Sequence, residues 1–243
     1  MIITTQVFQC RKCQSDNIIK NGHNHSGSPQ YLCKSCGARG VLTPKVRYTD
    51  AHKETVLRAY TERSSLRGLS RTFKHSRTTI TKWLKSKLKT LPEIRDTLQA
   101  CDNQDVLELD EVFSFVTRKS NKAWIWTALC ICKRTRQIVA YAIGDRSEST
   151  CKRLYDSIPA SYKHTHTYSN FWQAYAAILP EETHTSVGKE TGLTNHMERW
   201  NNTLRQRVGR VVRKTLSFSK VWWWHEKIIY WFIIIYNTSI TSI

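Results

Sequence analysis

The sequence has few glycines, few prolines, few acidic residues and no long hydrophobic run. With 9 glycines, 5 prolines and no repeat period in 243 residues, it is neither collagen-like nor of low complexity. The longest apolar run near its end, Ile228–Tyr236, has nine residues, which is too short to cross a bilayer. Residues 1–6 carry neither a basic residue nor an apolar core, so we expect no signal peptide and a cytoplasmic location.

The scarcity of acidic residues makes the chain strongly basic. It has 38 lysines and arginines against 19 aspartates and glutamates, a formal charge of +19. Residues 1–100 carry a net charge of +13, and residues 101–243 carry a net charge of +6. We therefore expect a polyanionic partner, most simply nucleic acid, although anionic membranes also attract basic proteins. A hydrophobic content of 40% is enough to bury a core and excludes a disordered chain.

Two cysteine pairs near the start have the spacing of a metal site. They are Cys10 with Cys13 and Cys33 with Cys36, and nineteen residues separate the two pairs. In a reducing cytosol, two such pairs typically hold zinc through four thiolates. Apolar residues between the pairs predict two short strands, so residues 1–45 are expected to form a zinc ribbon with one structural Zn²⁺. His23 and His25 lie between the pairs and are expected to face solvent.

Residues 46–90 show the pattern of three short helices. Apolar positions predict two helices before residue 74, and Ser76 is placed to cap a third that carries Ile80 and Trp83. This order is typical of a helix-turn-helix, whose last helix enters a DNA groove. The residues expected to face DNA are Arg77, Thr78, Thr79, Thr81, Lys82 and Lys85. An ordinary basic helical bundle also fits, but the preceding basic zinc ribbon favours DNA binding.

Strand and helix patterns alternate after a linker expected over residues 91–104. Three strand patterns occupy residues 106–143, and alternating helix and strand patterns follow up to residue 187. A long helix is expected from about Asn195 to Arg213. This order predicts a mixed α/β sheet with the element order of the RNase H-like fold over residues 105–216. The chain is therefore expected to be a multidomain α+β protein.

Two acidic residues of this predicted domain stand where a charge is costly without a partner. Asp110 lies within the first strand, and Glu198 borders the apolar stripe of the long helix, sharing a face with Asn202 and Arg205. An aspartate and a glutamate from separate elements could hold two Mg²⁺ ions for phosphoryl transfer, with Arg205 facing a DNA phosphate. Taken singly, each acid also fits a surface salt bridge.

Two further segments have a distinctive composition. Residues 199–220 contain no acid, and we expect them to form a surface that tracks phosphates. Its members include Arg207, Arg210, Arg213 and Lys214. Residues 217–243 have too many apolar faces for a surface helix. We expect this segment to pack on the core of the sheet or in a dimer interface, with membrane contact least favoured.

Several segments resemble the DDE transposases of the insertion-sequence-one family. They are Leu109–Phe113, Tyr168–Tyr175, His196–Asn202, Thr203–Arg207 and Arg213–Lys220. The zinc ribbon and helix-turn-helix match the N-terminal half of that family, so the resemblance covers almost the whole chain. It implies a transposase that binds double-stranded DNA at the inverted-repeat ends of its element, cleaves strands with metal and joins them to target DNA. It also implies an enzyme of the bacterial or archaeal nucleoid that works as a dimer or larger.

The resemblance assigns Asp110, position 170 and Glu198 as magnesium ligands and Arg205 as the basic residue two turns later. Asn170 departs from the family pattern, which has aspartate there. A neutral amide cannot match a carboxylate in holding Mg²⁺, so we expect strand cleavage to be severely reduced while the fold and DNA binding persist. Because the other motifs are intact, an inactivated form of an active enzyme is favoured over a decayed copy.

Two other functions stay open at this point. The first is a sequence-specific DNA-binding regulator, in which the zinc ribbon and helix-turn-helix work and the nuclease-like domain only dimerises. The second is a zinc-ribbon nuclease or RNA-binding protein unrelated to DNA mobility. Inverted repeats flanking the coding sequence would favour the transposase over the regulator.

Overall fold

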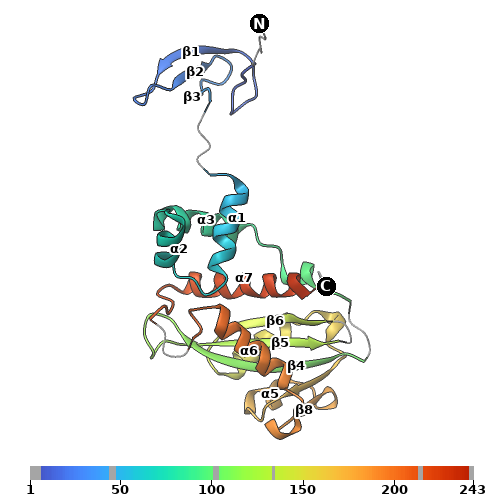
Figure 1. The fold of residues 1–243 in the computed structure, drawn as a ribbon. Coiled ribbons are helices and arrows are strands. Elements are labelled where there is room, and N and C mark those ends of the chain that lie inside the picture. The colour runs from blue at the N-terminus through green and yellow to red at the C-terminus, as the bar shows by residue number, and fades with distance from the viewer. Residues whose placement is uncertain (1–6, 44–47, 101–103, 133–134, 213–215, 241–243) are drawn as a thin grey trace. The chain divides into compact units, whose positions relative to one another are not determined.

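Two compact units make up the chain. The computed structural model describes residues 7–43, 48–100, 104–132, 135–212 and 216–240. The first unit covers residues 1–52 and the second covers residues 53–243. Together they contain helices and strands, which confirms the prediction of a mixed α+β protein (Figure 1).

The first unit contains a three-stranded antiparallel sheet. Its strands are β1 (Ile18–His23), β2 (Pro29–Cys33) and β3 (Arg39–Val41), in the order β1-β2-β3. Asn24 closes the turn between β1 and β2, because its Oδ1 accepts from the backbone N–H groups of Ser26 and Ser28 at 3.0 and 2.8 Å. Tyr31 on β2 is buried against Cys10 and Cys33. His23 and His25 are both exposed.

Three helices follow, with serines at the start of two of them. They are α1 (Asp50–Tyr60), α2 (Leu66–Phe73) and α3 (Arg77–Lys89). Ser65 accepts from Gly68 N–H and Ser76 accepts from Thr79 N–H, so each supplies a side-chain cap. Lys74 adopts a left-handed conformation with φ of 56°, which gives the tight break between α2 and α3.

A five-stranded mixed sheet forms the centre of the second unit. Its strands are β4 (Val106–Phe115), β5 (Lys122–Ile131), β6 (Arg136–Gly144), β7 (His166–Ser169) and β8 (His184–Ser186). The order is β6-β5-β4-β7-β8, with β4, β5 and β6 antiparallel. Strand β7 runs parallel to β4, and β8 runs parallel to β7. The sheet therefore changes from antiparallel to parallel pairing at β4.

Helices cover both faces of this sheet. The first face carries α4 (Glu148–Ser157) and α5 (Gln173–Ile178), and the second carries α6 (Asn195–Arg207) and α7 (Trp222–Ile240). Short 3₁₀ helices connect these elements: η1 (Ile94–Thr97), η2 (Ala160–Tyr162), η3 (Glu181–Thr183) and η4 (Lys189–Thr191).

Helix α6 is shorter than its sequence pattern predicted. It ends at Arg207, because Val208 leaves the helical conformation with ψ of 96° and Gly209 follows. Val208 and Val211 are nevertheless buried, and Val211 N–H donates to Val208 C=O at 2.9 Å. The apolar spacing thus continues through a turn, which explains why the prediction of a helix to Arg213 is wrong. Arg213 itself lies outside the described residues.

Helix α7 is apolar on all sides because it has neighbours on opposite sides. Its residues Ile229, Trp231 and Ile233 share one hydrophobic core with the sheet, with α6 and with buried residues of α1, α2 and α3. Figure 1 shows α7 running between the sheet and those three helices. No helix within the described ranges has both the length and the apolar character needed to span a membrane.

The segment expected to be a linker carries ordered structure. Within it, η1 packs against α7 and β6, and Tyr230 donates to the carbonyl of Pro92 at 2.7 Å. Gln99 N–H donates to Gln137 on β6 at 2.9 Å. Residues 101–103 of the segment lie outside the described part. Its described residues thus pack the chain that follows α3 against the edge strand β6 of the sheet.

Candidate active site and metal centre

Strand β4 carries three acidic side chains that alternate between the two faces of the sheet. Glu108 and Asp110 point to the face covered by α6, whereas Glu111 points to the face covered by α5. All three face protein groups with which they form hydrogen bonds. This cluster on the central strand is the starting point of the candidate active site.

Asp110 is held by two side-chain amides. Its Oδ1 accepts from Asn170 Nδ2 at 3.2 Å, and its Oδ2 accepts from Asn201 Nδ2 at 2.7 Å. The first contact follows from the pairing of β4 with β7, because Ser169 lies opposite Leu109 and Asn170 comes next. The pKa of Asp110 is raised to about 6, chiefly by burial and in addition by the negative charges of Glu111 and Glu198.

The orientation of the Asn170 amide is fixed by its second contact. Its Oδ1 accepts from the backbone N–H of Trp172 at 2.9 Å, so its nitrogen must face Asp110. Magnesium prefers oxygen ligands. Asn170 instead directs its N–H groups at the Asp110 carboxylate, which also accepts a hydrogen bond from Asn201. The donor set in this arrangement does not fit a pair of Mg²⁺ ions.

Helix α6 brings Glu198 and Arg205 to the same centre. Glu198 lies in the first turn of α6, half-exposed, with Oε1 3.8 Å from the Lys189 ammonium. The charge of Glu198 raises the pKa of Asp110 and the charge of Arg205 lowers it, after the larger effect of burial. Of the other three predicted catalytic residues, Asn170 thus contacts Asp110 directly, and Glu198 and Arg205 lie close enough for their charges to act on it.

The start of α6 is fastened to β4 by Glu108, which is only 2% exposed. Its Oε1 lies 2.6 Å from His196 Nδ1, and its Oε2 accepts from the backbone N–H of Met197 at 2.7 Å. An acid at a helix N-terminus satisfies backbone donors that have no partner within the helix. Glu108 therefore sets the position of Glu198 relative to Asp110.

Sequence reasoning missed Asn201 and Glu108. It placed Asn202 on the functional face of the helix, but Asn202 is exposed whereas Asn201 is buried and contacts Asp110. A polar residue within the apolar stripe between Met197 and Leu204 was the available signal. For Glu108, the signal was an acid two residues before Asp110, and hence on the same face of the strand.

Glu111 organises the opposite face. It accepts from Arg146 Nε and from Tyr175 Oη, each at 2.9 Å. The Arg146 guanidinium lies over the ring of Trp172, 3.8 Å from its centroid. Complete burial raises the pKa of Tyr175 well above its ordinary value, and the Glu111 charge adds to the effect. This network holds Trp172, whose backbone N–H orients Asn170.

The four N-terminal cysteines form a compact cluster in the first unit. Their sulfur atoms all lie within 4.8 Å of one another, with Cys10 to Cys36 at 3.7 Å and Cys13 to Cys33 at 3.6 Å. A tetrahedral site with Zn–S bonds of about 2.3 Å has S–S edges of about 3.8 Å. The spacing and chemistry of the donors therefore fit zinc, which would cross-link the two cysteine turns.

The two cysteine turns have matching backbone geometry. Gln14 N–H donates to Cys10 C=O at 2.8 Å, and Gly37 N–H donates to Cys33 C=O at 2.9 Å. Both Gln14 and Gly37 have positive φ, of 58° and 70°. Gly37 adopts this conformation without strain, as the tight turn requires.

The side chains expected to contact DNA come from two segments of the chain, helix α3 and the region around the end of α6. On α3, Arg77, Thr78, Lys82 and Lys85 are exposed, Thr81 is half-buried, and the Thr79 hydroxyl is hydrogen bonded to Ser76 at 2.8 Å. At the end of α6, Arg207 pairs with Glu62, and after the helix Arg210 donates to the Tyr60 hydroxyl at 2.8 Å. Arg213 and Lys214 lie outside the described residues. Thr79 is thus engaged in capping α3.

Comparison with known proteins gives a consistent set of relatives. The family model described as IS1 transposase matches residues 105–238. The chain is 36% identical over 128 residues to the insertion element iso-IS1n protein InsB of Shigella dysenteriae, covering 53% of this chain and 93% of that protein. It is 34% identical over 122 residues to the insertion element IS1 protein InsB of Shigella flexneri, covering 50% and 88%. The insertion element IS1 4 protein InsB of Escherichia coli K12 is 33% identical over 122 residues, covering 50% and 70%.

Proposed function

The chain belongs to the IS1 transposase family, and we propose that it binds the inverted-repeat ends of its own insertion sequence as double-stranded DNA. Residues 105–216 then form an RNase H-like DDE domain. Support for this domain comes from the strand order β6-β5-β4-β7-β8, with antiparallel pairing on one side of β4 and parallel pairing on the other. In this domain Asp110 lies within β4, Asn170 directly follows β7 and Glu198 lies in the first turn of α6.

One observation carries the proposal. Asp110, Asn170 and Glu198 come from three different elements, yet Asn170 contacts Asp110 directly and the charge of Glu198 acts on it. Convergence of acidic positions from separate elements is costly for stability unless the site acts on a ligand. Arg205, whose charge also reaches Asp110, is suited to a phosphate of the DNA strand.

We further propose that strand cleavage and joining are severely reduced in this chain. Asn170 offers Asp110 an N–H donor where the family pattern has a carboxylate, so two negative charges face this centre instead of three. The Asp110 carboxylate is then satisfied by protein amides. An aspartate at position 170 would restore a carboxylate set of the kind that holds divalent ions in phosphoryl transfer.

End recognition is assigned to the N-terminal half. Helix α3 presents Arg77 and Thr78 near its N-terminus for base edges and Lys82 and Lys85 for phosphates. The zinc-binding unit adds positive charge beside it in sequence. Because two element ends must be joined in one reaction, we propose that the working form is at least a dimer.

Binding to terminal DNA tests this function. Fluorescence anisotropy should show that the zinc-loaded chain binds a duplex of the element's terminal repeat more tightly than a scrambled duplex. Arg77→Ala should remove the preference, whereas Lys85→Ala should weaken both duplexes alike and reduce the salt dependence. Equal affinity for both duplexes in the parent chain would contradict end recognition.

A DNA-binding regulator is the second candidate, and the closed hydrogen bonds at Asp110 favour it. The two candidate functions predict different strand-joining activity for Asn170→Asp. Repeat binding without strand joining, even after Asn170→Asp, would support the regulator. Strand joining by Asn170→Asp would support the transposase.

A further inference from the structure

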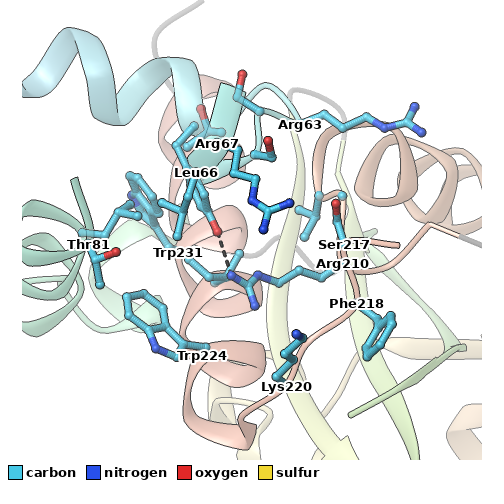
Figure 2. Close-up of a pocket in the computed structure, with 18 of the residues that line it drawn as sticks. Arg63, Leu66, Arg67, Thr81, Arg210, Ser217, Phe218, Lys220, Trp224 and Trp231 are labelled. Carbon is cyan, nitrogen blue, oxygen red and sulfur yellow. Dashed lines mark hydrogen bonds between the residues drawn. The ribbon is translucent and has the colours of Figure 1, made fainter. Parts of the chain in front are cut away.

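A cavity of about 840 Å³ lies between the three-helix region and the segment that joins α6 to α7. The turn between α1 and α2 and the exposed side of α3 form one wall, and the start of α7 forms another. In Figure 2, Trp224 and Trp231 lie on one side, Phe218 lies on the other, and Arg210 and Lys220 lie between them. The cavity lies apart from Asp110 and its partners, none of which lines it.

The lining of the cavity is positively charged. Six cationic side chains line it: Arg63, Arg67, Arg77, Arg207, Arg210 and Lys220. Among the described residues that line it there is no aspartate or glutamate. Arg207 pairs with Glu62 outside the lining, but no described carboxylate lies within salt-bridge distance of Arg67 or Lys220. Such an excess of guanidinium groups is suited to phosphate.

The floor of the cavity is apolar and aromatic. Leu66, Leu84, Trp224, Ile228, Trp231 and Phe232 contribute to it. Trp224 lines the cavity and is only half-buried. The Thr81 and Ser217 hydroxyls add a small number of polar groups beside this floor. An apolar floor with a cationic rim suits a flat ring that carries a phosphate.

The size of the cavity limits which part of a nucleic acid can enter it. Its volume lies in the range of roughly 300–1,000 Å³ that is typical of small-molecule pockets, so a DNA duplex cannot enter it. A base turned out of the helical stack can enter, because aromatic rings and arginines bind unstacked bases irrespective of sequence. Arg77 and Thr78 line the mouth and stand at the start of α3. DNA that contacts α3 therefore passes directly over the opening.

We propose that this cavity receives one unstacked nucleotide of the DNA bound at α3, with its base on the Trp224 side and its phosphates on Arg67 and Lys220. This site deepens the proposed function, because it rests on DNA binding at α3. Such a site would make the chain bind unpaired or weakly paired DNA more tightly than perfect duplex, because no free energy is needed to break a base pair before the base enters the cavity.

The test compares paired and mispaired DNA with the full zinc-loaded chain. Anisotropy is measured with a terminal-repeat duplex and with versions of it that carry a pair of mismatches at successive positions. We expect one mismatch position to bind about tenfold more tightly than the paired duplex. Trp224→Leu and Arg67→Gln should abolish this gain, and Trp224→Phe should keep it. Trp222→Leu is the matched control, because Trp222 lies on the same helix but does not line the cavity.

Thermal unfolding of each variant reports on folding, and binding of the parent to paired duplexes reports on the proposed function. Each variant should keep the parent's unfolding transition, which shows that it is folded. If the parent binds paired terminal and scrambled duplexes equally, the proposed end recognition is wrong. If it recognises the paired end but gains nothing from any mismatch, or if the gain survives both Trp224→Leu and Arg67→Gln, the cavity proposal is wrong. A different result would indicate an acidic protein partner. In that case mismatches would not raise the affinity for DNA, and added polyglutamate would displace the DNA.

Discussion

Asn170 donates a hydrogen bond to Asp110, with its Nδ2 3.2 Å from Asp110 Oδ1. The backbone N–H of Trp172 donates to Asn170 Oδ1, so both ends of the Asn170 amide have a hydrogen-bond partner in this orientation. A carboxylate at position 170 would instead meet Asp110 as a like charge, and the pair would need a proton or a cation between them. We therefore propose that this one side-chain amide decides whether Asp110 is occupied by hydrogen bonds from the protein or is open to metal.

The first prediction concerns the stability of the chain as a function of pH. Burial raises the pKa of Asp110 to about 6, so the fold favours the protonated carboxyl. The resulting stabilisation is fully present below the unfolded-state pKa of about 4 and is lost as pH rises through about 6. The parent should therefore lose stability relative to Asp110→Asn as the pH rises. The difference in unfolding free energy between the two proteins should change by about 1–2 kcal/mol in favour of Asp110→Asn from about pH 4 to pH 8. Urea unfolding at both pH values measures this.

The control for that measurement is Asp156→Asn. Asp156 is exposed and pairs with Lys152 on α4. Its substitution should change stability little at either pH. If Asp110→Asn and Asp156→Asn showed the same pH profile, the burial of charge at Asp110 would be contradicted.

The second prediction concerns the anchoring of α6. Glu108→Gln keeps the size of the side chain but removes the charge that accepts from Met197 N–H and faces His196. We expect a loss of about 1–3 kcal/mol in unfolding free energy, because hydrogen bonds to a buried charged group are involved. The exposed Glu182→Gln is the comparison and should be neutral. Unchanged thermal stability of Glu108→Gln would show that Glu108 does not fasten α6.

The elements that position the site follow local patterns and were predictable from sequence. Alternating apolar residues in β4 placed Asp110 mid-strand, and the serine before α3 marked its start. The C-terminal limit of α6 was not predictable, because Val208 and Val211 keep helical spacing while forming a buried turn. Periodicity records which residues are buried, whereas the end of a helix depends on backbone conformation at Val208 and Gly209.

The contacts around Asp110 were only partly predictable for a related reason. The roles of Asp110, Asn170 and Glu198 came from a family resemblance, and the parallel pairing of β4 with β7 is a long-range fact that no local pattern contains. Asn201 was overlooked because helical spacing of three or four residues places both Asn201 and Asn202 near Glu198. Tertiary packing selects the first, which is buried.

The third prediction concerns removal of zinc. The four cysteine sulfur atoms are close enough to share one tetrahedral ion, and among the described residues of the first unit only Cys10, Tyr31 and Cys33 form its buried apolar core. Such a small core depends on the metal for its folding energy. Chelation should therefore unfold this unit and abolish end binding while the melting transition of residues 53–243 persists in calorimetry. End binding that survives complete loss of zinc would exclude a DNA-binding role for the ribbon.

We propose that the residue at position 170 decides whether this centre cleaves DNA. Magnesium-dependent nicking of terminal-repeat DNA by the parent chain and by Asn170→Asp measures it most directly, with Asn170→Ala as a control that also removes the hydrogen bond to Asp110. We predict cleavage by Asn170→Asp only, at least about a hundredfold above both the parent and Asn170→Ala, because only aspartate supplies the missing carboxylate. Equal cleavage by the parent and Asn170→Asp would contradict the account.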